Sequence, residues 1–497
     1  EARLNLEYLQ SIICAVPPKK TTKQQATEEE WASITQNIEA LYQKLQAEFF
    51  IARTAWSKKN DPNYDQKVED YAVPSEMHWL AVRGDRYLSH NIPHFKDLLS
   101  PHDSIFRELF EISVEDFLQA LGKVLHNFTR GPMESMEEFD RFRKATLAAL
   151  EGYIAADRNE SDIAVLMDKV IADNGWGAWR DEVIENAIGL GLFELDTSTG
   201  LPTKLLDALS WTPGEDDEFL SEGPYRGWPL LVLPIWKRPF LKVEGKHYCF
   251  GIYALTDHLY RIVQCTILQL KPEYREIWNR HQQNVAEQLP LNLFSRVLPG
   301  CEIYRSVYYQ WNTGDNQRRQ WCETDGLLVY DDHLIVIEVK AGAFTHSPPS
   351  TDFPAYIRSL ENLLRAPALQ AVRFCSYLDS SPEVSIYDKE HRLIRQVRRS
   401  DYRHITRCCV TLDQITEYAA RAEAMADIGI NVGGQPVWNI SVDDLRVFAD
   451  IFRNPLVFCH FLEERAQAYS AKEFETDDEL DHLGLYLDCA PSAGDPS

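Results

Sequence analysis

The chain has 497 residues, of which 44% are hydrophobic, a length that predicts two to four domains with ample core. Its formal net charge of −25 argues against a surface built broadly for phosphate binding, which needs clustered lysine and arginine. No stretch approaches the roughly 20 apolar residues of a membrane helix and the N-terminus lacks a signal-peptide pattern, so we expect a cytoplasmic protein with no membrane partner.

Residues 1–215 are predicted to form a mainly helical region. Thr27-x-x-Glu30 is a capping pattern at the start of a long periodic segment that reaches Lys58, and Ser113 begins a further helix. No Walker A loop or dinucleotide fingerprint is found, which excludes ATP hydrolysis by a P-loop mechanism. We predict a recognition or regulatory region that can bind a partner protein or a second copy of the chain.

Residues 216–270 have the pattern of short strands followed by a helix. Glu244-Gly245 is typical of a two-residue hairpin turn, and an apolar helix is expected from about Tyr253. We interpret this segment as a small β-containing brace for the domain that follows it.

The segment 271–415 carries the features that indicate chemistry. A helix is expected over Pro272–Leu289, because proline favours the first helical turn and apolar residues recur near one face. A first strand is expected over Cys301–Trp311, followed by a polar loop over Asn312–Gln320.

Two apolar strands follow, and a tight turn at Asp331-Asp332 joins them. If the turn is symmetric, Asp325 lies opposite Glu338 and Glu323 lies opposite Lys340. Side chains two apart on a strand share a face, so these four groups form one cluster at the end of the hairpin. Both faces of the hairpin are otherwise apolar, which predicts a strand pair buried on both sides.

The chemistry of this cluster favours a divalent cation. Two buried carboxylates repel each other and are unfavourable to desolvate, and a cation compensates both effects. Carboxylate oxygens at this spacing suit Mg²⁺ or Mn²⁺, which also bind substrate phosphate oxygens. Lys340 can then orient or deprotonate a water and stabilise negative charge on phosphorus. The alternative is an ordinary cross-strand salt bridge between Glu323 and Lys340 at a solvated hairpin end.

The chain after the hairpin predicts a helix, a basic segment and one more strand. The helix runs from about Tyr356 to Leu378, and Pro367 is expected to kink or split it. Lys389–Arg407 is strongly basic, and a strand over Arg407–Asp413 follows it. The basic segment either tracks a phosphate backbone, with Arg318 and Arg319 as a second contact, or is a solvated basic face, or docks the acidic tail.

The remaining chain is predicted to be helical and then poorly ordered. Ser441 begins a helix by its capping pattern within the segment 416–472. Residues 473–497 are acidic and then rich in Ala, Pro, Ser and Gly, a composition typical of poorly ordered tails. The ten cysteines show no Cys-x-x-Cys spacing and are expected to be reduced core thiols.

Asp325, the Glu338-Val-Lys340 tripeptide and the order of elements around them resemble the catalytic core of the PD-(D/E)XK nuclease superfamily. That family has the restriction-endonuclease-like fold: a helix with a glutamate, a three-stranded antiparallel meander, a helix, and a strand that joins the sheet in parallel. The resemblance covers roughly Pro272 to Asp413 and is nearest to RecB-like and nuclease-related-domain members. Thr324 stands where the family motif has a proline, which many members also lack.

The resemblance implies a role for each residue of the cluster. Asp325 and Glu338 would bind Mg²⁺ or Mn²⁺ with help from the carbonyl of Val339, and Lys340 would activate water. Glu287 would be an additional metal-site acid, with a solvated helix carboxylate as the alternative.

The resemblance extends to the following helix. Gln370 corresponds to the glutamine of a Gln-x-x-x-Tyr element and would support catalysis, although Phe374 replaces the tyrosine and a plain helix glutamine is the alternative. The chain as a whole is then a mixed α/β protein. It combines a restriction-endonuclease-like core with a large, mainly α-helical N-terminal region and a helical C-terminal segment.

The resemblance implies a Mg²⁺-dependent deoxyribonuclease that hydrolyses phosphodiester bonds in DNA. Bacterial nucleases of this type with a large accessory region are frequently restriction or anti-phage effectors, so antiviral defence is a further expectation. The competing interpretations are a catalytically inactive nuclease-like scaffold that binds proteins or nucleic acid, and a ribonuclease or structure-selective enzyme. The arginines expected to contact nucleic acid are Arg318, Arg319, Arg395, Arg398 and Arg399.

Overall fold

The computed structural model describes most of the chain. Its described residues are 2–18, 26–81, 86–156, 162–312, 319–342, 352–415, 425–426, 428–471, 476 and 478–489. Most of the predicted polar loop over Asn312–Gln320, including Arg318, lies outside them, as does the end of the acidic tail. None of the described helices combines the length and the low polarity that crossing a lipid bilayer demands.

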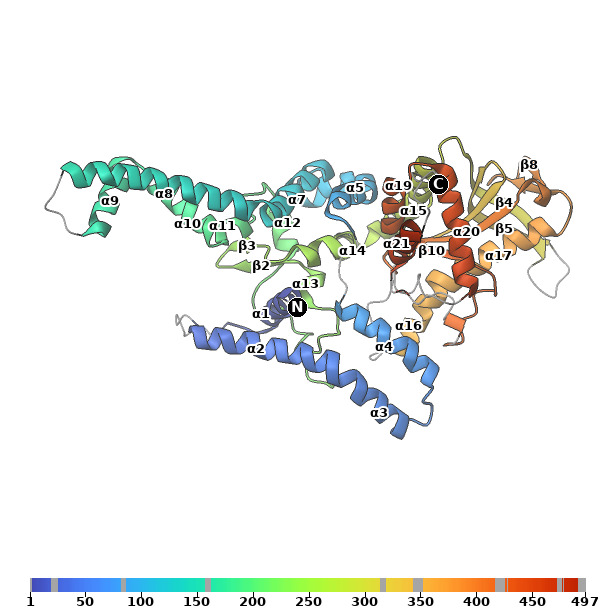
Figure 1. Cartoon of the computed structure of the whole chain (residues 1–497), viewed down its shortest axis with the longest axis horizontal. Helices are drawn as coiled ribbons and strands as arrows, with labels where there is room; N and C mark the ends of the chain where they lie inside the picture. The colour runs from blue at the N-terminus through green and yellow to red at the C-terminus, as the bar shows by residue number, and fades with distance from the viewer. Residues whose placement is uncertain are drawn as a thin grey trace, which may run out of the picture. The chain divides into compact units, whose positions relative to one another are not determined.

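The chain is a mixed α/β protein that forms two compact units (Figure 1). Unit 1 consists of Glu1–Ile38, Ile92–Trp228 and Leu233–Tyr274, and unit 2 of Glu39–Asn91, Pro229–Val232 and Arg275–Ser497. The division after Tyr274 lies close to the predicted domain start at residue 271. The predicted 1–215 region is not one unit, however, and the 216–270 segment belongs almost entirely to unit 1.

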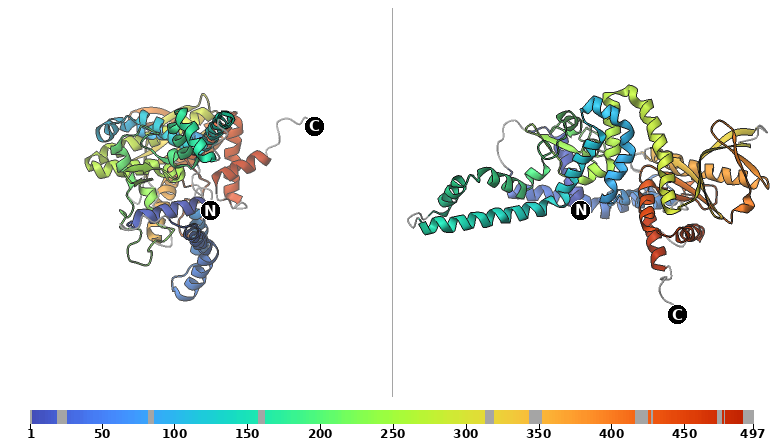
Figure 2. Two further views of the ribbon diagram at one scale, coloured as in Figure 1. Left: turned by 90° about the vertical axis from the view of Figure 1, so that its left-hand side faces the viewer. Right: turned by 90° about the horizontal axis from the view of Figure 1, so that it is seen from above.

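The chain before Arg275 is mainly helical, with one small sheet. Its elements are α1 (Ala2–Ala15), α2 (Glu28–Lys44), the π-helical turn η1 (Leu45–Phe49), α3 (Phe50–Asn60), α4 (Gln66–Ala81), α5 (Leu88–Leu99), η2 (Ser100–His102), α6 (Asp103–Phe110), α7 (Val114–Thr129), α8 (Gly131–Ala156), α9 (Ile163–Asp173), α10 (Gly177–Ala187), α11 (Leu190–Phe193), α12 (Thr203–Ala208), β1 (Ser210–Trp211), α13 (Pro234–Lys237), β2 (Phe240–Val243), β3 (Lys246–Tyr248), α14 (Ile252–Leu270) and η3 (Pro272–Tyr274). Figure 2 shows α9 and α10 alongside the long helix α8.

Local sequence patterns correctly predict the starts of α2 and α7 and the turn between β2 and β3. The capping pattern before α2 is formed, because the Glu30 N–H donates to Thr27 Oγ1 over 3.1 Å and the Thr27 N–H donates to Glu30 Oε2 over 2.9 Å. Ser113 caps α7 in the same manner, accepting from the Asp116 N–H. The predicted Glu244-Gly245 turn joins β2 to β3, with φ angles of 51° and 84°.

Residues 39–91 join unit 2 because they carry side chains that its core covers. Tyr71 on α4 lies in one core cluster with Tyr356. Arg86 adds a polar link, since its guanidinium donates two hydrogen bonds of 2.7 Å to the buried carboxylate of Asp443. Such long-range packing has no local sequence signal, which is why the sequence assigned this segment to the N-terminal region.

Unit 2 is built around a seven-stranded mixed sheet with the strand order β10-β9-β6-β5-β4-β7-β8. β6, β9 and β10 run parallel, and the other neighbours pair antiparallel. From Arg275 the elements are α15 (Arg275–Val297), β4 (Glu302–Asn312), β5 (Arg319–Tyr330), β6 (His333–Lys340), α16 (Phe353–Leu360), the π-helical turn η4 (Glu361–Arg365), α17 (Ala366–Asp379), β7 (Val384–Tyr387), β8 (Leu393–Val397), η5 (Arg399–Asp401), β9 (His404–Thr411), β10 (Trp438–Ser441), α19 (Val442–Ile451), α20 (Pro455–Ala471) and α21 (Glu479–Cys489).

The predicted hairpin register is confirmed near the turn and then ends. Tyr330 pairs with His333, and the ladder continues to Gly326 opposite Ile337. Beyond that pair, β5 and β6 are no longer joined by backbone hydrogen bonds. The expected opposition of Asp325 to Glu338 as a strand pair is therefore wrong, and the two strands diverge at the acidic cluster.

The divergence coincides with an irregularity in the neighbouring strand. Ser306 in β4 has a φ of 46°, the left-handed region that non-glycine residues rarely adopt. It lies between the pairs Arg305–Gly326 and Val307–Thr324, directly across from Asp325. This unusual backbone conformation therefore lies at the level of the acids.

Helices cover both faces of the sheet. α17 packs on the face that carries Leu327 and Val336, where it shares a core cluster with them through Phe374. α15 packs on the other face: a Cβ added at Gly326 would lie 2.8 Å from Leu291 Cδ2, so only glycine permits this close approach. The hairpin is thus buried on both sides, as predicted.

The predicted helix over Tyr356–Leu378 is not split at Pro367: a π-helical turn, η4, widens it and ends at Arg365, and the backbone stays helical through both junctions. Pro367 occupies the first turn of α17, where a missing N–H is tolerated. The widened turn keeps α16 and α17 in one continuous helical segment rather than two separate helices.

The C-terminal segment is more ordered than the composition predicts. Ser441 caps α19 as expected. Residues 479–489 form helix α21, which contradicts the prediction of a poorly ordered tail from residue 473. The reason is a buried ion pair: Arg465 Nε lies 3.0 Å from Glu479 Oε1, and the Trp438 indole N–H donates to the same carboxylate oxygen over 2.6 Å. The average composition of the tail does not reveal that a single carboxylate, Glu479, anchors it.

Candidate active site

Four elements of unit 2 meet where β5 and β6 diverge. β5 contributes Asp325, β6 contributes Glu338 and Lys340, α15 contributes Glu287 and α17 contributes Gln370. The structure thus brings together all five residues that the sequence predicted to be catalytic. Hydrogen bonds and mutual electrostatic effects connect them, as described next.

Asp325 occupies the gap between the two strands. Its Oδ2 atom accepts a hydrogen bond of 2.6 Å from the backbone N–H of Val339, in the place where a strand partner would bind. Burial raises the pKa of the Asp325 carboxyl, although this hydrogen bond and the positive charge of Lys340 oppose the shift. The side chain therefore joins the strands and leaves Oδ1 for a further partner.

Glu338 is the most deeply buried acid of the site, with 1% of its surface exposed. No donor among the described residues meets hydrogen-bond geometry at its Oε1 atom, although the neighbouring Thr324 hydroxyl interacts with the carboxyl and opposes the rise of its pKa. Burial raises the pKa of this carboxyl well above its usual value, and the neighbouring charge of Asp325 adds to the effect. A buried carboxylate with so little hydrogen bonding is costly, so the site favours either a bound proton or a bound cation.

The donor atoms at this point fit a hard divalent cation. Asp325 and Glu338 each offer a carboxylate oxygen, and carboxylates are the usual protein ligands of Mg²⁺. The carbonyl of Lys340 faces β9, since it accepts from the Leu412 N–H over 3.0 Å. Backbone groups alternate along a strand, so the carbonyl of Val339 faces the gap beside Asp325 and can supply a third oxygen.

Lys340 is held by α17. Its Nζ donates a hydrogen bond of 2.8 Å to Gln370 Oε1, so the glutamine is not a plain helix residue but a partner of the candidate catalytic lysine. The alternative of a Glu323–Lys340 salt bridge is not what the structure contains. Glu323 on β5 instead pairs with Tyr308 on β4, and its carboxylate accepts a hydrogen bond from the Tyr308 hydroxyl.

Glu287 faces the cluster rather than bulk solvent. Burial raises the pKa of its carboxyl, and the charges of Asp325 and Glu323 raise it further. Gln283, one turn earlier on α15, donates to Glu287 Oε1 over 2.8 Å. Of the two interpretations left open by the sequence, the geometry favours a site acid over a solvated helix carboxylate.

Three supporting residues were missed by the sequence. Arg373 lies one turn after Gln370 on α17, donates to the Tyr309 hydroxyl over 3.1 Å and places positive charge near Glu338. Gln282 donates to the carbonyl of Ala341 over 2.6 Å and fixes the chain that leaves β6. Helical spacing from Gln370 could have identified Arg373, whereas nothing local marks Gln282.

Tyr308 is the third missed residue, and it links the acids to a group of rings. Burial and the hydrogen bond to Glu323 raise its pKa to about 12. Trp321 stacks on His391 with ring centroids 3.8 Å apart and planes 1° apart, and Tyr308 and Tyr387 contact these rings edge-on. We call Trp321, His391, Tyr308 and Tyr387 the aromatic group.

The arginines expected to contact nucleic acid are mostly paired with carboxylates. Arg395 lies 2.8 Å from Glu302. Arg398 lies 3.0 Å from Glu383, and Arg399 lies 3.5 Å from Asp379. Their side chains are 36%, 61% and 44% exposed, which agrees with the alternative of a solvated basic face, and local acids rather than the acidic tail pair with them. Arg319 at the start of β5 is exposed, and Arg318 lies outside the described residues.

Comparisons with known proteins give no relative. No family model matches the chain, and neither a curated protein nor a solved structure is significantly similar to it. The site must therefore be interpreted from its own geometry.

Proposed function

We propose that unit 2 is a PD-(D/E)XK-type nuclease core and that the chain hydrolyses phosphodiester bonds in DNA with Mg²⁺ or Mn²⁺. The observation that carries the proposal is the nearly fully buried carboxyl of Glu338, which lies beside Asp325 and next to a lysine held by Gln370. Buried neighbouring acids are rare in purely structural cores, whereas metal-dependent phosphoryl transfer uses them to hold its ion.

The order of elements supports the same proposal. A helix with Glu287 precedes three antiparallel strands, and a helix with Gln370 follows them; β7 and β8 come next in the chain, before β9, which is parallel to β6. This is the order that the sequence resemblance implies. The strands β10, β7 and β8 extend the sheet beyond that common core.

Each residue then has a physical task in hydrolysis. Asp325, Glu338 and the Val339 carbonyl hold the ion, and Glu287 adds a carboxylate that can orient water. When bound, a divalent ion supplies positive charge to the phosphate oxygens and lowers the pKa of water. Lys340 stabilises the negative charge that develops on phosphorus, in a position that the hydrogen bond to Gln370 fixes in advance.

The aromatic group suggests how a nucleic acid is held. Trp321 is 39% exposed and lies two residues before Glu323 on β5, beside Tyr308. Bases stack on such rings when they are not paired with another strand, at about 1–3 kcal/mol per base. The proposed substrate is therefore DNA with unpaired bases near the cleavage point.

Cleavage assays with Mg²⁺ test the proposal directly. Circular single-stranded DNA, plasmid DNA and RNA would be offered to the wild type and to Asp325→Asn and Lys340→Met. Asp331→Asn, which changes an exposed acid in the turn of the same hairpin, is the matched control. We expect cleavage of DNA by the wild type and the control only.

Two results would count against the proposal. Cleavage that survives both substitutions removes the site from the mechanism. No cleavage of any nucleic acid, together with Mg²⁺ binding that is unaffected by Asp325→Asn, supports the alternative of an inactive scaffold.

A further inference from the structure

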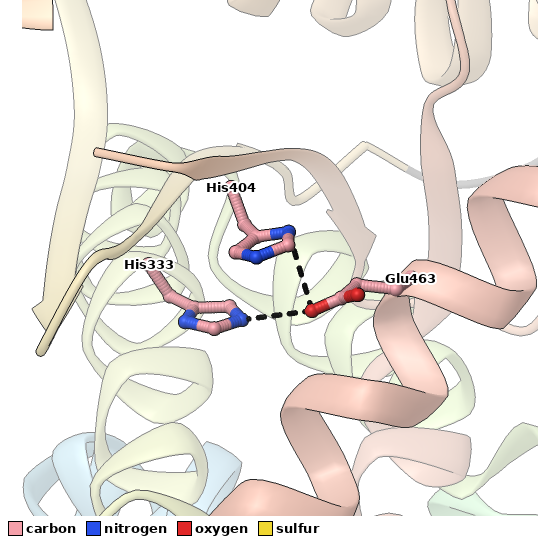
Figure 3. A group of neighbouring side chains, drawn as sticks. All are labelled: His333, His404 and Glu463. Carbon is pink, nitrogen blue, oxygen red and sulfur yellow. Dashed lines mark hydrogen bonds and ion pairs between the residues drawn. The ribbon is translucent and has the colours of Figure 1, made fainter. Parts of the chain in front are cut away.

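A second polar cluster lies at the opposite end of the same strands. His333 begins β6, His404 begins β9 and the two residues pair across the parallel ladder. Glu463 on α20 points between them, so that its Oε1 atom lies 3.2 Å from His333 Nε2 and 3.2 Å from His404 Nδ1 (Figure 3). The three side chains are 13%, 27% and 35% exposed.

The hydrogen-bonding capacity of His333 does not match its surroundings. Its Nδ1 atom lies 3.0 Å from Asp332 Oδ1, while its Nε2 atom faces Glu463. A neutral imidazole carries one N–H, so one of these two contacts lacks a proton. The ring of His404 stacks against that of His333, with centroids 4.4 Å apart and planes 15° apart. A cation bound by His333 Nε2, His404 Nδ1 and Glu463 Oε1 would leave the Nδ1 atom of His333 to donate to Asp332, so both contacts of His333 would be used.

The dimensions of the cluster agree with a tetrahedral metal. Zinc bonds of about 2.0–2.1 Å to nitrogen and oxygen place neighbouring ligand atoms about 3.3 Å apart in a tetrahedron. Both nitrogen–oxygen distances to Glu463 are 3.2 Å, and all three ligand atoms lie within 4.8 Å of one another. Asp332 then receives the Nδ1–H of His333, which is the usual outer partner of a metal-bound imidazole.

The ligand set also specifies the kind of ion. Two imidazoles and one carboxylate favour Zn²⁺ and its first-row neighbours over Mg²⁺, which prefers oxygen ligands. His333 precedes Glu338 by five residues along β6, which corresponds to about 16 Å of strand. This cluster is therefore separate from the acids of the candidate active site.

We propose that His333, His404 and Glu463 form a binding site for one Zn²⁺ ion. Bound zinc ties α20 to the beginnings of β6 and β9, so its role is to stabilise unit 2 rather than to take part in hydrolysis. The fourth coordination position is open to water.

Zinc binding by the full-length chain tests this proposal without an activity assay. Protein stripped with a chelator would be dialysed against ZnCl₂ and its metal content measured, and CoCl₂ would be added in parallel as a spectroscopic probe. We expect one tightly bound Zn²⁺ per chain, tetrahedral cobalt absorption bands and a higher melting temperature with zinc. His404→Ala and Glu463→Gln should each weaken zinc binding at least about 100-fold.

Matched variants make the test specific. His126→Ala removes the histidine of a His126–Glu134 pair in unit 1, which has a comparable imidazole–carboxylate contact of 2.9 Å but no second histidine in the pair. It should leave zinc binding unchanged, as should Asp325→Asn. The Glu463→Gln variant keeps the shape of the side chain, so its circular dichroism in chelator should match the wild type.

Zinc stoichiometry that is unaffected by His404→Ala and Glu463→Gln would overturn the proposal. So would zinc binding that is lost in Asp325→Asn and kept in His404→Ala, because the ion would then belong to the acidic site. Failure of every cleavage assay would leave the proposal standing, since these measurements do not depend on catalysis.

Discussion

The two ends of β6 place different chemistry on one strand. At the end of β6, burial raises the pKa values of Asp325 and Glu338, and Glu338 is almost fully buried. At its beginning, His333 and His404 share a carboxylate that is one-third exposed. Burial disfavours the charge of the acids, and their oxygen atoms suit the hard cation proposed for that end, whereas the partly buried imidazoles suit the softer ion proposed for the other end. Burial and ligand type, rather than the number of acids, therefore distinguish the two proposed sites.

The largest expected effect is a difference in the DNA cleavage rate between variants at the two ends of β6. Lys340→Met should lower the DNA cleavage rate by about 10²–10³, because it removes the positive charge next to phosphorus. His404→Ala should lower it less than about threefold when both proteins are folded. Single-turnover cleavage rates with Mg²⁺ measure both values. Equal losses in the two variants would mean that the ends do not act separately.

The second effect concerns substrate binding beside the acidic end. Trp321→Ala should weaken binding of single-stranded DNA by about 1–3 kcal/mol, while Trp321→Phe keeps most of the affinity. Trp56→Ala is the matched control, since Trp56 is 64% exposed on α3 and remote in sequence. Fluorescence anisotropy with a labelled oligonucleotide measures the dissociation constants. Similar losses for both tryptophans would remove the aromatic group from recognition.

The third effect is a gain in the stability of the metal-free protein when the candidate metal ligand Glu338 is replaced. The pKa of this carboxyl in the fold lies well above its usual 4.5, so the folded chain retains a proton that the unfolded chain releases. Stability from this group is complete below the unfolded pKa and is lost as the pH rises through the folded pKa. Glu338→Gln should therefore stabilise the metal-free protein by about 1–3 kcal/mol at pH 8, and by much less at pH 4.

Urea unfolding in the presence of chelator measures this difference in the free energy of unfolding. Glu463→Gln at the other end of the sheet is the comparison, and it should give no such gain. A Glu338→Gln variant that is less stable than the wild type at pH 8 would contradict the assignment of Glu338 as a strained, metal-seeking acid.

The smallest effect distinguishes free from paired arginines. Arg319→Ala should reduce the slope of log affinity against log salt by about 1, as expected for one lost phosphate contact. Arg395→Ala should leave the slope nearly unchanged, because Arg395 is paired with Glu302 and hydrogen-bonded to Tyr304. Titrations of DNA binding between low and moderate salt give both slopes.

Local signals in the sequence predicted much of the fold. Capping residues, a turn at Asp331-Asp332 and the apolar runs on both sides of it gave the helices and the hairpin with nearly correct bounds. These features act over a few residues, so the sequence contains them explicitly. The five predicted catalytic residues also converge in the structure, because strand register and helix order bring them to one end of the sheet.

What the sequence could not give depends on contacts between distant segments. The pairing of Glu323 with Tyr308 requires the register of β4 on β5, which an intervening loop of arbitrary length conceals. The His333–His404 pair requires the parallel register of β6 on β9, and Glu463 comes from a helix further along the chain. The sequence likewise shows the arginines between Lys389 and Arg407 as a basic segment, but it does not show the carboxylates that pair with them in the fold.

The left-handed Ser306 has a consequence for how this protein can change over evolution. Insertions or deletions between Asn312 and Arg319 would change only the length of the connection between β4 and β5. A single residue gained or lost between the start of β4 at Glu302 and Ser306 would exchange the two faces of that part of the strand relative to its neighbour. Homologous chains should therefore vary in the length of the connection between β4 and β5 but keep the number of residues from Glu302 to Ser306 constant.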